Sequence, residues 1–178
     1  MKDSSEHLLA LVNSLLDFYR LDINKIEVAR VAFSPAQLFE TIRAGFAAAA
    51  AAKGLELRLE TGPDAARTVT GDAFHIRQIA DNLVSNALKF TTKGSITLSY
   101  TLNDNGQVRF CVTDTGKGIL AEQCHDIFNR FVKLDSFVQG AGLGLSICQS
   151  LVERMGGKIG VESCVGKGSC FWLSLIHI

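Results

Sequence analysis

The spacing of hydrophobic residues along the chain predicts a mixture of helices and strands. Apolar residues that recur every three or four positions predict helices over residues 4–21, 34–53, 72–90 and 145–155. Apolar and polar residues alternate, as is typical of strands, over residues 25–33, 55–60, 95–102, 107–113, 158–162 and 169–175. Because strands and helices are mixed without strict alternation, we expect an α+β fold built as a layered sandwich.

Capping and turn residues mark the ends of these elements. Ser34 followed by Pro35 is typical of a helix start, and Lys53-Gly54 is typical of a helix end. Asp72 is the expected N-cap of the third helix. Asn105-Gly106 predicts a hairpin between the strands at 95–102 and 107–113.

The first helix carries a broad apolar stripe, in which Leu8, Val12, Leu15 and Tyr19 are spaced as in a helical bundle. This helix could pack on its own domain, but the width of the stripe favours half of a hairpin whose partner helix is missing. Residues 22–24 resemble a linker. We therefore expect a helical segment at 1–24 and a separate domain at 25–178.

The third helix carries two asparagines, Asn82 and Asn86, four residues apart. At about 100° per residue they belong to one polar stripe, made of His75, Gln78, Asn82, Asn86 and Lys89. An apolar stripe adjoins it, made of Ile76, Ile79, Leu83, Ala87 and Phe90. A solvated face normally carries Lys and Glu, so uncharged amides beside the core indicate a bound ligand, although such a pair alone is a weak signal.

Composition excludes two classes of partner. Lys and Arg total 18, and Asp and Glu also total 18. The chain therefore lacks the excess of basic residues that is typical of a nucleic-acid-binding domain. No apolar stretch approaches the ~20 residues that span a bilayer. Asp3 and Glu6 lie where a signal peptide would be basic. We therefore expect no contact with nucleic acid and no membrane contact.

The five cysteines include no Cys-x-x-Cys pair, which argues against a zinc site. Cys111 and Cys148 fall within apolar runs and are predicted to be buried thiols. Thiols of this kind indicate a reducing cytosol.

Asp114 follows a strand and precedes two glycines, Gly116 and Gly118. A carboxylate in this place could accept a hydrogen bond from the exocyclic amine of adenine, whereas guanine presents an oxygen there and would be repelled. The glycines would let a ring approach the backbone. An ordinary Asp-x-Gly turn is the alternative, and such turns are common.

A second glycine-rich segment, residues 140–144, precedes the helix at 145–155. Free N–H groups at a helix start bind phosphate. The segment lacks the closing Gly-Lys-Ser/Thr of a P-loop, and Leu145 stands where the dinucleotide fingerprint has its third glycine. It could equally be a hinge, or serve both purposes.

Two further features suit a nucleotide with its metal. Mg²⁺ prefers hard oxygen ligands such as the amide oxygen of Asn86, and Lys89 one turn later could neutralise phosphate charge. Between the glycine segments, Phe128 and Phe131 would anchor a mobile loop whose Arg130 and Lys133 reach phosphates when it closes. A plain amphipathic turn is the alternative for this loop.

In this order, the motifs resemble the catalytic and ATP-binding domain of bacterial sensor histidine kinases, in the gyrase, heat-shock-90, histidine-kinase and MutL ATPase superfamily. The resemblance extends over about residues 25–176, and residues 4–27 resemble the second helix of the family's dimerisation hairpin. The matching segments are an asparagine box at 82–91, glycine boxes at 114–119, 142–145 and 166–169, and a phenylalanine box at 127–131.

The resemblance implies a two-layer α/β sandwich with a mixed sheet, the Bergerat-type ATP-binding fold. ATP would lie between the asparagine helix and the lid, with Asn82 and Lys89 in catalysis and Asn86 on Mg²⁺. Asp114 would read adenine beside Phe90, and Ser169 would support the carboxylate. The other residues implied to contact the nucleotide are Gly116, Gly118, Ile119, Arg130, Phe131, Lys133, Gly142, Leu143, Gly144 and Leu145.

Two departures from the superfamily's pattern bear on the reaction. Asn82 stands where the ATP hydrolases carry a glutamate that activates water, and an amide cannot act as a general base, so a kinase is favoured over a hydrolase. None of the histidines, at positions 7, 75, 125 and 177, has the acidic residue and later proline of the phosphoacceptor motif. We therefore expect a fragment that starts after the acceptor helix and does not label itself.

The expected function is that of a protein-histidine kinase in a two-component phosphorelay, which transfers the γ-phosphate of ATP to a histidine on a separate helix. A nucleotide-binding regulatory module without transferase activity is the alternative. Expected partners are the phosphoacceptor helix of the parent kinase, the receiver domain of a response regulator, and a second copy bound through the helical hairpin. The chain is expected in the cytoplasm, whether or not its parent is anchored in the inner membrane.

Overall fold

A computed structural model describes residues 27–62, 66–102, 107–129, 132 and 142–175. Its centre is a five-stranded sheet in the order β2-β4-β5-β7-β6. Strands β2 and β4 run parallel and the other neighbours antiparallel, so the sheet is mixed. The strands are β2 (Glu56–Thr61), β4 (Ser95–Leu102), β5 (Val108–Asp114), β6 (Lys158–Cys164) and β7 (Gly168–Leu175).

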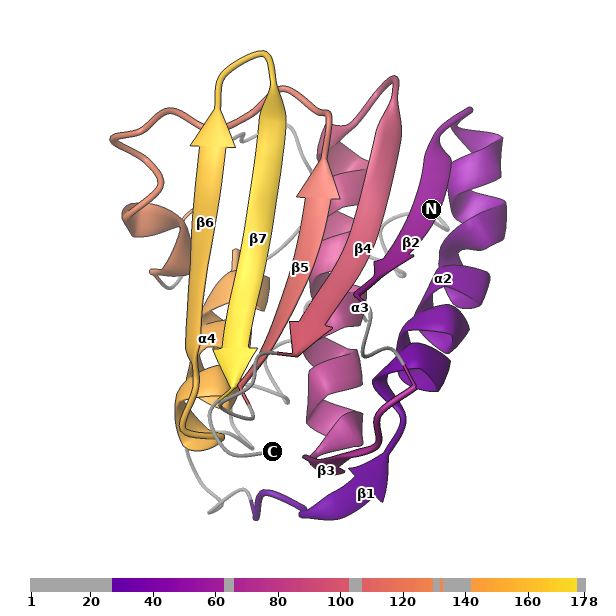
Figure 1. Ribbon diagram of the computed structural model, residues 1–178. Helices are drawn as coiled ribbons and strands as arrows, with labels where there is room; N and C mark the ends of the chain where they lie inside the picture. The colour runs from indigo at the N-terminus through magenta and orange to yellow at the C-terminus, as the bar shows by residue number, and fades with distance from the viewer. Residues whose placement is uncertain (1–26, 63–65, 103–106, 130–131, 133–141, 176–178) are drawn as a thin grey trace, which may run out of the picture.

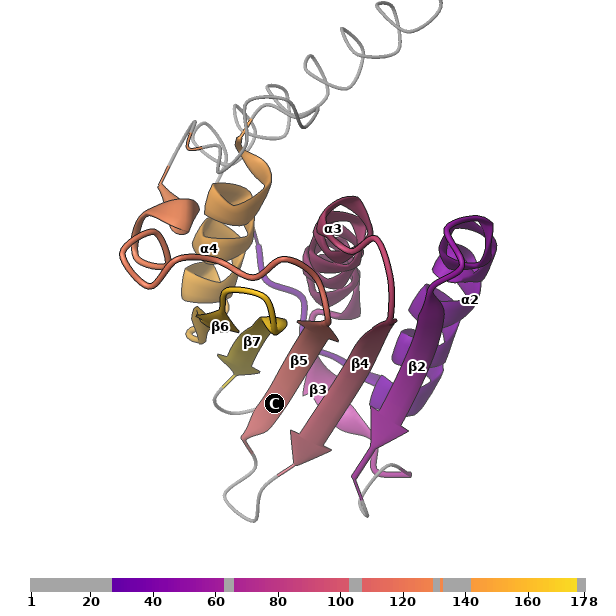
Figure 2. The same ribbon diagram turned by 90° about the horizontal axis from the view of Figure 1, so that it is seen from above.

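The helices that the structure describes all lie on one face of this sheet, and none of them covers the other face (Figures 1 and 2). They are α2 (Pro35–Ala52), α3 (Ala73–Phe90) and α4 (Gly144–Arg154), and a short 3-10 helix, η1, spans Asp126–Phe128. A separate two-stranded sheet pairs β1 (Val31–Phe33) with β3 (Val69–Gly71). The predicted α+β sandwich with a mixed sheet is confirmed. In the part of the chain that the structure describes, no helix is long and apolar enough to cross a membrane.

Three sequence-based expectations were wrong in detail. The strand predicted over 25–33 is limited to Val31–Phe33, because its partner β3, which the sequence did not predict, offers only three residues to pair with. Helix α4 begins at Gly144, one residue earlier than expected. Cys111 is half-buried on the open face of the sheet, whereas Cys148 is buried as predicted. The helix predicted over 4–21 and its linker lie outside the described residues.

The core lies between the sheet and the helices. The apolar stripe of α3 is buried there as predicted, through Ile76, Ile79, Leu83 and Ala87. From α2, Phe39 stacks on Phe110 of β5 with ring centroids 5.0 Å apart. Because α3 packs its apolar side on the sheet, its polar stripe runs along the border of the core.

The N-terminus of α3 is held by the buried carboxylate of Asp72. One oxygen accepts a hydrogen bond from the backbone N–H of His75 at 2.9 Å, as an N-cap does. The other oxygen accepts from the backbone N–H of Ala29 at 2.9 Å and lies 2.7 Å from Nδ1 of His75. Burial acts to raise the pKa of Asp72, but these hydrogen bonds outweigh it and lower the pKa. Asp72 therefore joins the segment before β1 to the start of α3.

Replacing Asp72 by alanine is expected to lower the free energy of unfolding by about 1–2 kcal/mol, because the cap and the link to Ala29 are both lost. Urea unfolding followed by circular dichroism at pH 7 measures the change. Folding lowers the pKa of Asp72, so the ionised carboxylate contributes fully to the free energy of unfolding above its unfolded-state pKa of about 3.9. This contribution disappears as the pH falls through the folded-state pKa. Exposed Asp126 is the matched control, and its alanine variant should change stability by less than about 0.5 kcal/mol. Equal losses for the two variants would contradict the assignment.

Candidate functional site

A small pocket opens where β5 ends and β7 begins, between the sheet and the helices. It encloses about 50 Å³. Its walls come from the C-terminal half of α3, the turn after β5, the first turn of α4, and β7. The lining residues are Asn86, Ala87, Phe90, Asp114, Lys117, Gly118, Ile119, Leu145, Ser169 and Phe171. Four segments that are distant in the sequence therefore meet at one end of the sheet.

Asp114, the last residue of β5, is the only carboxylate among these lining residues, and 5% of it is exposed. Burial raises its pKa, although hydrogen bonds from the backbone N–H groups of Gly116 and Ser169 oppose that shift. The bond from Gly116 to Oδ1 is 2.8 Å long. Both bonds leave acceptor capacity on the carboxylate, which can serve a donor group of a ligand in the pocket.

The two glycines after Asp114 are needed for different reasons. A side chain on Gly116 would begin 2.8 Å from Oδ1 of Asp114 and 2.6 Å from the carbonyl oxygen of Phe90, so it would crowd the carboxylate. Gly118 has a positive φ of 71°, and a side chain there would begin 2.1 Å from the carbonyl oxygen of Cys164. Gly116 thus keeps the carboxylate accessible, whereas Gly118 lets the turn pack on the end of β6.

The hydroxyl of Ser169 contacts another serine. It lies 2.9 Å from the hydroxyl of Ser163, which accepts a hydrogen bond from the backbone N–H of Ile119 at 2.8 Å. The main-chain N–H of Ser169 is the group that supports the carboxylate. The pairing of Asp114 with Ser169 in the β5–β7 register brings the two residues together.

Two residues of this region fall within the matched motifs but were given no role from the sequence. Thr91, just after α3, is fully buried, and its hydroxyl has no hydrogen-bond partner. It lies beside Gly116, because a side chain on that glycine would begin 3.0 Å from the hydroxyl. Lys117 places its ammonium 5.1 Å from the centroid of the Phe90 ring. An unpartnered buried hydroxyl next to a buried carboxylate is typical of a site that completes its hydrogen bonds with a ligand or water.

The second asparagine of α3, Asn86, lines the pocket, and Asn82 lies one turn earlier against the start of α4. A side chain on Gly144 would begin 2.6 Å from Oδ1 of Asn82, so glycine is required for this approach. Just before α4, Gly142 has a φ of 70° and Leu143 is buried. The asparagine row and the second glycine segment, predicted as parts of one site, are therefore neighbours.

Lys89, another predicted site residue, does not line the pocket. It is exposed in the last turn of α3. Arg130, Phe131 and Lys133 lie outside the described residues. Within the described residues, no group of three or more His, Cys, Asp or Glu side chains could hold a metal ion.

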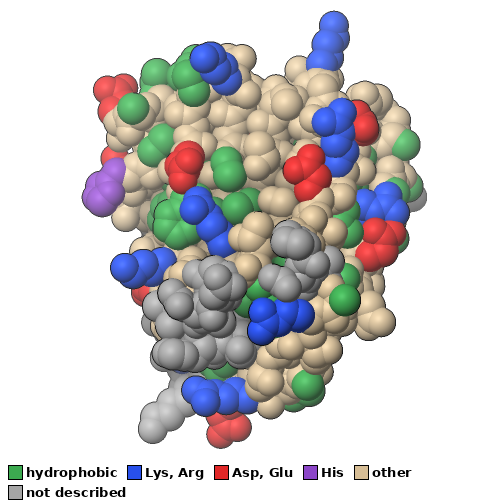
Figure 3. All heavy atoms as spheres, in the orientation of Figure 1, with side chains coloured by type: hydrophobic (Ala, Val, Ile, Leu, Met, Phe, Trp, Pro, Cys, Tyr) green, Lys and Arg blue, Asp and Glu red, His purple; other side chains and the backbone are tan. Residues whose placement is uncertain are grey.

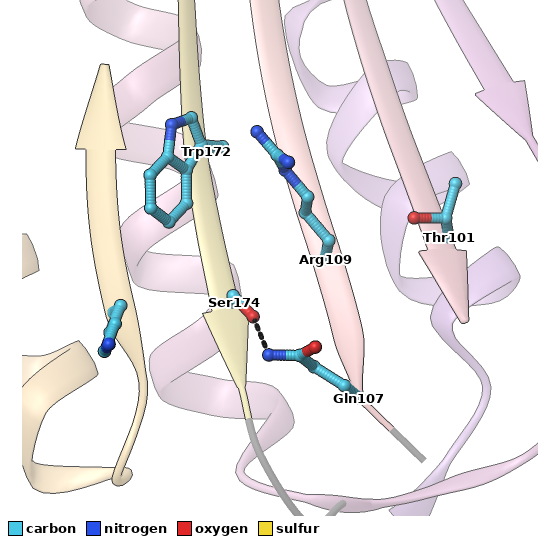
Figure 4. A pocket seen from close by; sticks show the side chains of 6 residues that line it. Thr101, Gln107, Arg109, Trp172 and Ser174 are labelled. Atoms are coloured by element: carbon cyan, nitrogen blue, oxygen red, sulfur yellow. Dashed lines mark hydrogen bonds between the residues drawn. The ribbon is translucent and has the colours of Figure 1, made fainter. Parts of the chain in front are cut away.

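A larger hollow, of about 390 Å³, lies on the open face of the sheet (Figure 4). It is lined by Thr101, Gln107, Arg109, Lys158, Trp172 and Ser174. Figure 3 shows that acidic and basic side chains are interspersed on this face. The residues that line this hollow include neither a carboxylate nor a glycine. The smaller pocket has both, at Asp114 and Gly118, and therefore fits the predicted motifs better.

Comparison with known proteins places this fold and its motifs in one family. Residues 71–177 match the family described as histidine kinase-, DNA gyrase B-, and HSP90-like ATPase. Sensor protein GacS of Pseudomonas syringae pv. syringae is 38% identical over 183 residues, which cover 98% of this chain and 20% of GacS. The chain thus spans about a fifth of the length of the curated relatives it matches.

Two solved structures of histidine kinases share the fold. Full-length ShkA in complex with AMPPNP is 37% identical, with a TM-score of 0.89 over 97% of this chain and 36% of ShkA. The catalytic domain of ThkA is 28% identical, with a TM-score of 0.74 over 83% of this chain and 95% of that domain. The chain therefore belongs to the histidine kinase-, DNA gyrase B- and HSP90-like ATPase family, as the ATP-binding catalytic domain of a two-component sensor histidine kinase.

Proposed function

We propose that this domain transfers the γ-phosphate of ATP to a histidine on a separate helix, for relay to the receiver domain of a response regulator. The observation that carries the proposal is the buried carboxylate of Asp114, which shares one pocket with the amide of Asn86 and the ring of Phe90. The similarity to ShkA, which was solved with AMPPNP, supports an adenine nucleotide as the ligand.

At the adenine end, Asp114 would accept the hydrogen bond of the exocyclic amine, and the orphaned hydroxyl of Thr91 would complete the polar contacts directly or through water. Phe90 and Ile119 would pack on the ring, as apolar walls of nucleotide pockets do. Gly116 keeps the carboxylate open to the ring. A guanine base would place an oxygen against Asp114, so adenine is selected.

At the phosphate end, the donors present fit Mg²⁺. The amide oxygen of Asn86 is a hard ligand, and one protein ligand suffices because Mg²⁺ usually keeps waters and phosphate oxygens. When bound, the ion would neutralise negative charge on the phosphates. Near it, backbone amides of Gly142 and Gly144 before α4 would bind phosphate oxygens, beside Leu143 and Leu145.

For the transfer step, an imidazole nitrogen of the acceptor would attack the γ-phosphorus in line, and positively charged side chains would balance the charge of the transition state. Lys89, Arg130 and Lys133 are the proposed cations. Asn82, beside Gly144, would orient the reacting groups through its amide without activating water, which suits a kinase that conserves ATP.

The same proposal includes the division of the chain into two domains. Residues 1–24 would be the end of a dimerisation and phosphoacceptor hairpin, and residues 25–178 the catalytic domain. The parent kinase would dimerise through that hairpin and act in the cytoplasm on its own acceptor helix.

The test supplies the missing acceptor. The chain is incubated with γ-labelled ATP and Mg²⁺, alone and with a purified helical hairpin that carries the acceptor histidine of a related sensor kinase. We expect acid-labile, alkali-stable label on the hairpin and no label on the chain itself.

Binding of ATP without label on the hairpin would favour a regulatory nucleotide-binding module. Acid-labile label on His7 or His125 would overturn the proposal that the acceptor lies on another helix. Steady phosphate release that Asn82→Ala abolishes would indicate a hydrolase instead.

A further inference from the structure

The face of the sheet that no described helix covers holds the larger hollow, of about 390 Å³. Its volume falls in the range of roughly 300–1,000 Å³ that is typical of small-molecule sites. The hollow lies where β5 begins and β7 ends, at Gln107, Arg109 and Ser174. The nucleotide pocket opens at the opposite ends of these two strands, on the side of the helices. The two sites are therefore separate.

Ser174, at the floor of the hollow, lies between two basic residues. The strand register pairs it with Arg109 of β5 on one side and with Lys158 of β6 on the other. Nε2 of Gln107 donates a hydrogen bond of 2.7 Å to the hydroxyl oxygen of Ser174 (Figure 4). Because the hydroxyl oxygen accepts this bond, its own hydrogen can be donated to a ligand. The hollow thus offers three kinds of donor, which are a guanidinium, an ammonium and a hydroxyl.

The charges around the hollow favour an anion. Within the described residues, Lys158 forms no ion pair. Arg109 forms one of 3.1 Å with Glu162, which is not among the lining residues. The two side chains of this pair are 47% and 71% exposed, so the attraction between them is weak in water. The remaining N–H groups of the guanidinium can bind a ligand anion, although Glu162 competes with it.

Trp172 gives the hollow a flat apolar wall. It lies opposite Gly160 in the β6–β7 register, and a side chain on that glycine would begin 2.5 Å from Cζ2 of the indole. The indole therefore extends over β6. The guanidinium carbon of Arg109 lies 4.9 Å from the centroid of the tryptophan ring (Figure 4). Because indole and guanidinium are both planar, a ring of the ligand can pack against this pair.

We propose that the hollow binds a phosphate monoester of a ring compound. The phosphate group would lie over Ser174 between Arg109 and Lys158, and the ring would pack against Trp172. A phosphate monoester has three strong acceptor oxygens, which match the three kinds of donor. It carries close to two negative charges at pH 7, which match the two cations better than the single charge of a carboxylate does.

The test uses the fluorescence of Trp172, which is the only tryptophan in the chain and so reports on the hollow alone. The full chain is titrated with phenyl phosphate at pH 7 in low salt. We expect a saturable change with a Kd of roughly 1 mM, as for a small ligand of ordinary efficiency, and weaker binding as salt is raised. Benzoate and inorganic phosphate should bind more weakly, and phenol should give no saturable change.

Two variants test the charges. Lys158→Gln should weaken binding of phenyl phosphate by about fivefold, the limit for an exposed ion pair. Glu162→Gln should tighten it by about threefold, because the competing carboxylate is removed. Lys167→Gln is the matched control, since Lys167 is exposed in the turn at the other end of β6 and does not line the hollow. Its variant should bind like the wild type.

Five results would overturn the proposal. They are no saturable change with phenyl phosphate, equal binding of phenol, equal binding of benzoate, unchanged affinity in both Lys158→Gln and Glu162→Gln, and competition by saturating Mg-ATP. The last result would mean that phenyl phosphate enters the nucleotide pocket. None of these measurements involves transfer of phosphate to a histidine, so their failure is distinct from a failure of the proposed function.

Discussion

Replacing Asp114 by asparagine is expected to weaken ATP binding by roughly ten- to a hundredfold, which corresponds to about 1.5–3 kcal/mol for a hydrogen bond to a charged group. The carboxylate is buried at the end of β5, and backbone N–H groups of Gly116 and Ser169 hold it in place. An asparagine of the same shape keeps an acceptor for these groups but lacks the charge that attracts the adenine amine. Calorimetric titration with ATP and with GTP measures both affinity and base selectivity.

The matched control is Asp81→Asn, the same change at a partly exposed site on α3. Asp81 lies 3.6 Å from Arg77 and is absent from the pocket wall, so its variant should bind ATP like the wild type. The ratio of ATP to GTP affinity should fall only in Asp114→Asn. Normal ATP binding by that variant would refute the assignment of adenine to this pocket.

Replacing Asn86 by alanine is expected to remove the gain in ATP affinity that Mg²⁺ provides. The affinity for ATP in the presence of Mg²⁺ should fall at least roughly tenfold, because losing a group that only supports a metal ligand already costs about tenfold in metal affinity. The amide lines the pocket on the side of α3, and the described residues offer no acidic cluster to replace it. Affinity for ATP in EDTA should change little. Titrations with Mg²⁺ and with EDTA separate the two contributions.

Gln78→Ala is the control for this experiment, because Gln78 belongs to the same polar stripe of α3 but does not line the pocket. Its variant should keep the full response to Mg²⁺. If Asn86→Ala also kept it, the metal would be held by other groups. Normal binding of Mg-ATP by both Asp114→Asn and Asn86→Ala would mean that the nucleotide lies elsewhere.

Much of the pocket could be predicted because its residues come in short local motifs. Asn86 follows Asn82 by one helical turn, so both side chains share a face of α3. Asp114 was expected to end a strand, because the alternation of apolar and polar residues stops there. Thr91 ends the asparagine motif, but its role could not be found in this way. Its hydroxyl matters because α3 and the turn after β5 bury it beside Gly116, and no local pattern marks that contact.

The same distinction explains Gly118 and Cys111. The sequence suggested that Gly118 makes room for a ring, but its positive φ and its approach to Cys164 depend on the end of β6, some 45 residues away. Cys111 was predicted to be buried because its neighbours along β5 are apolar. Its half-exposure arises because none of the helices that the structure describes covers that face of the sheet.

Local periodicity and capping therefore determined the main helices, most of the strands, the mixed α+β class and the identity of the asparagine and Asp-x-Gly motifs. The order β2-β4-β5-β7-β6, the pairing of Asp114 with Ser169 and the contact of Gly144 with Asn82 were decided only by tertiary structure. Backbone preferences and side-chain periods act over a few residues, whereas strand order and the faces that become covered depend on packing between segments far apart in the chain.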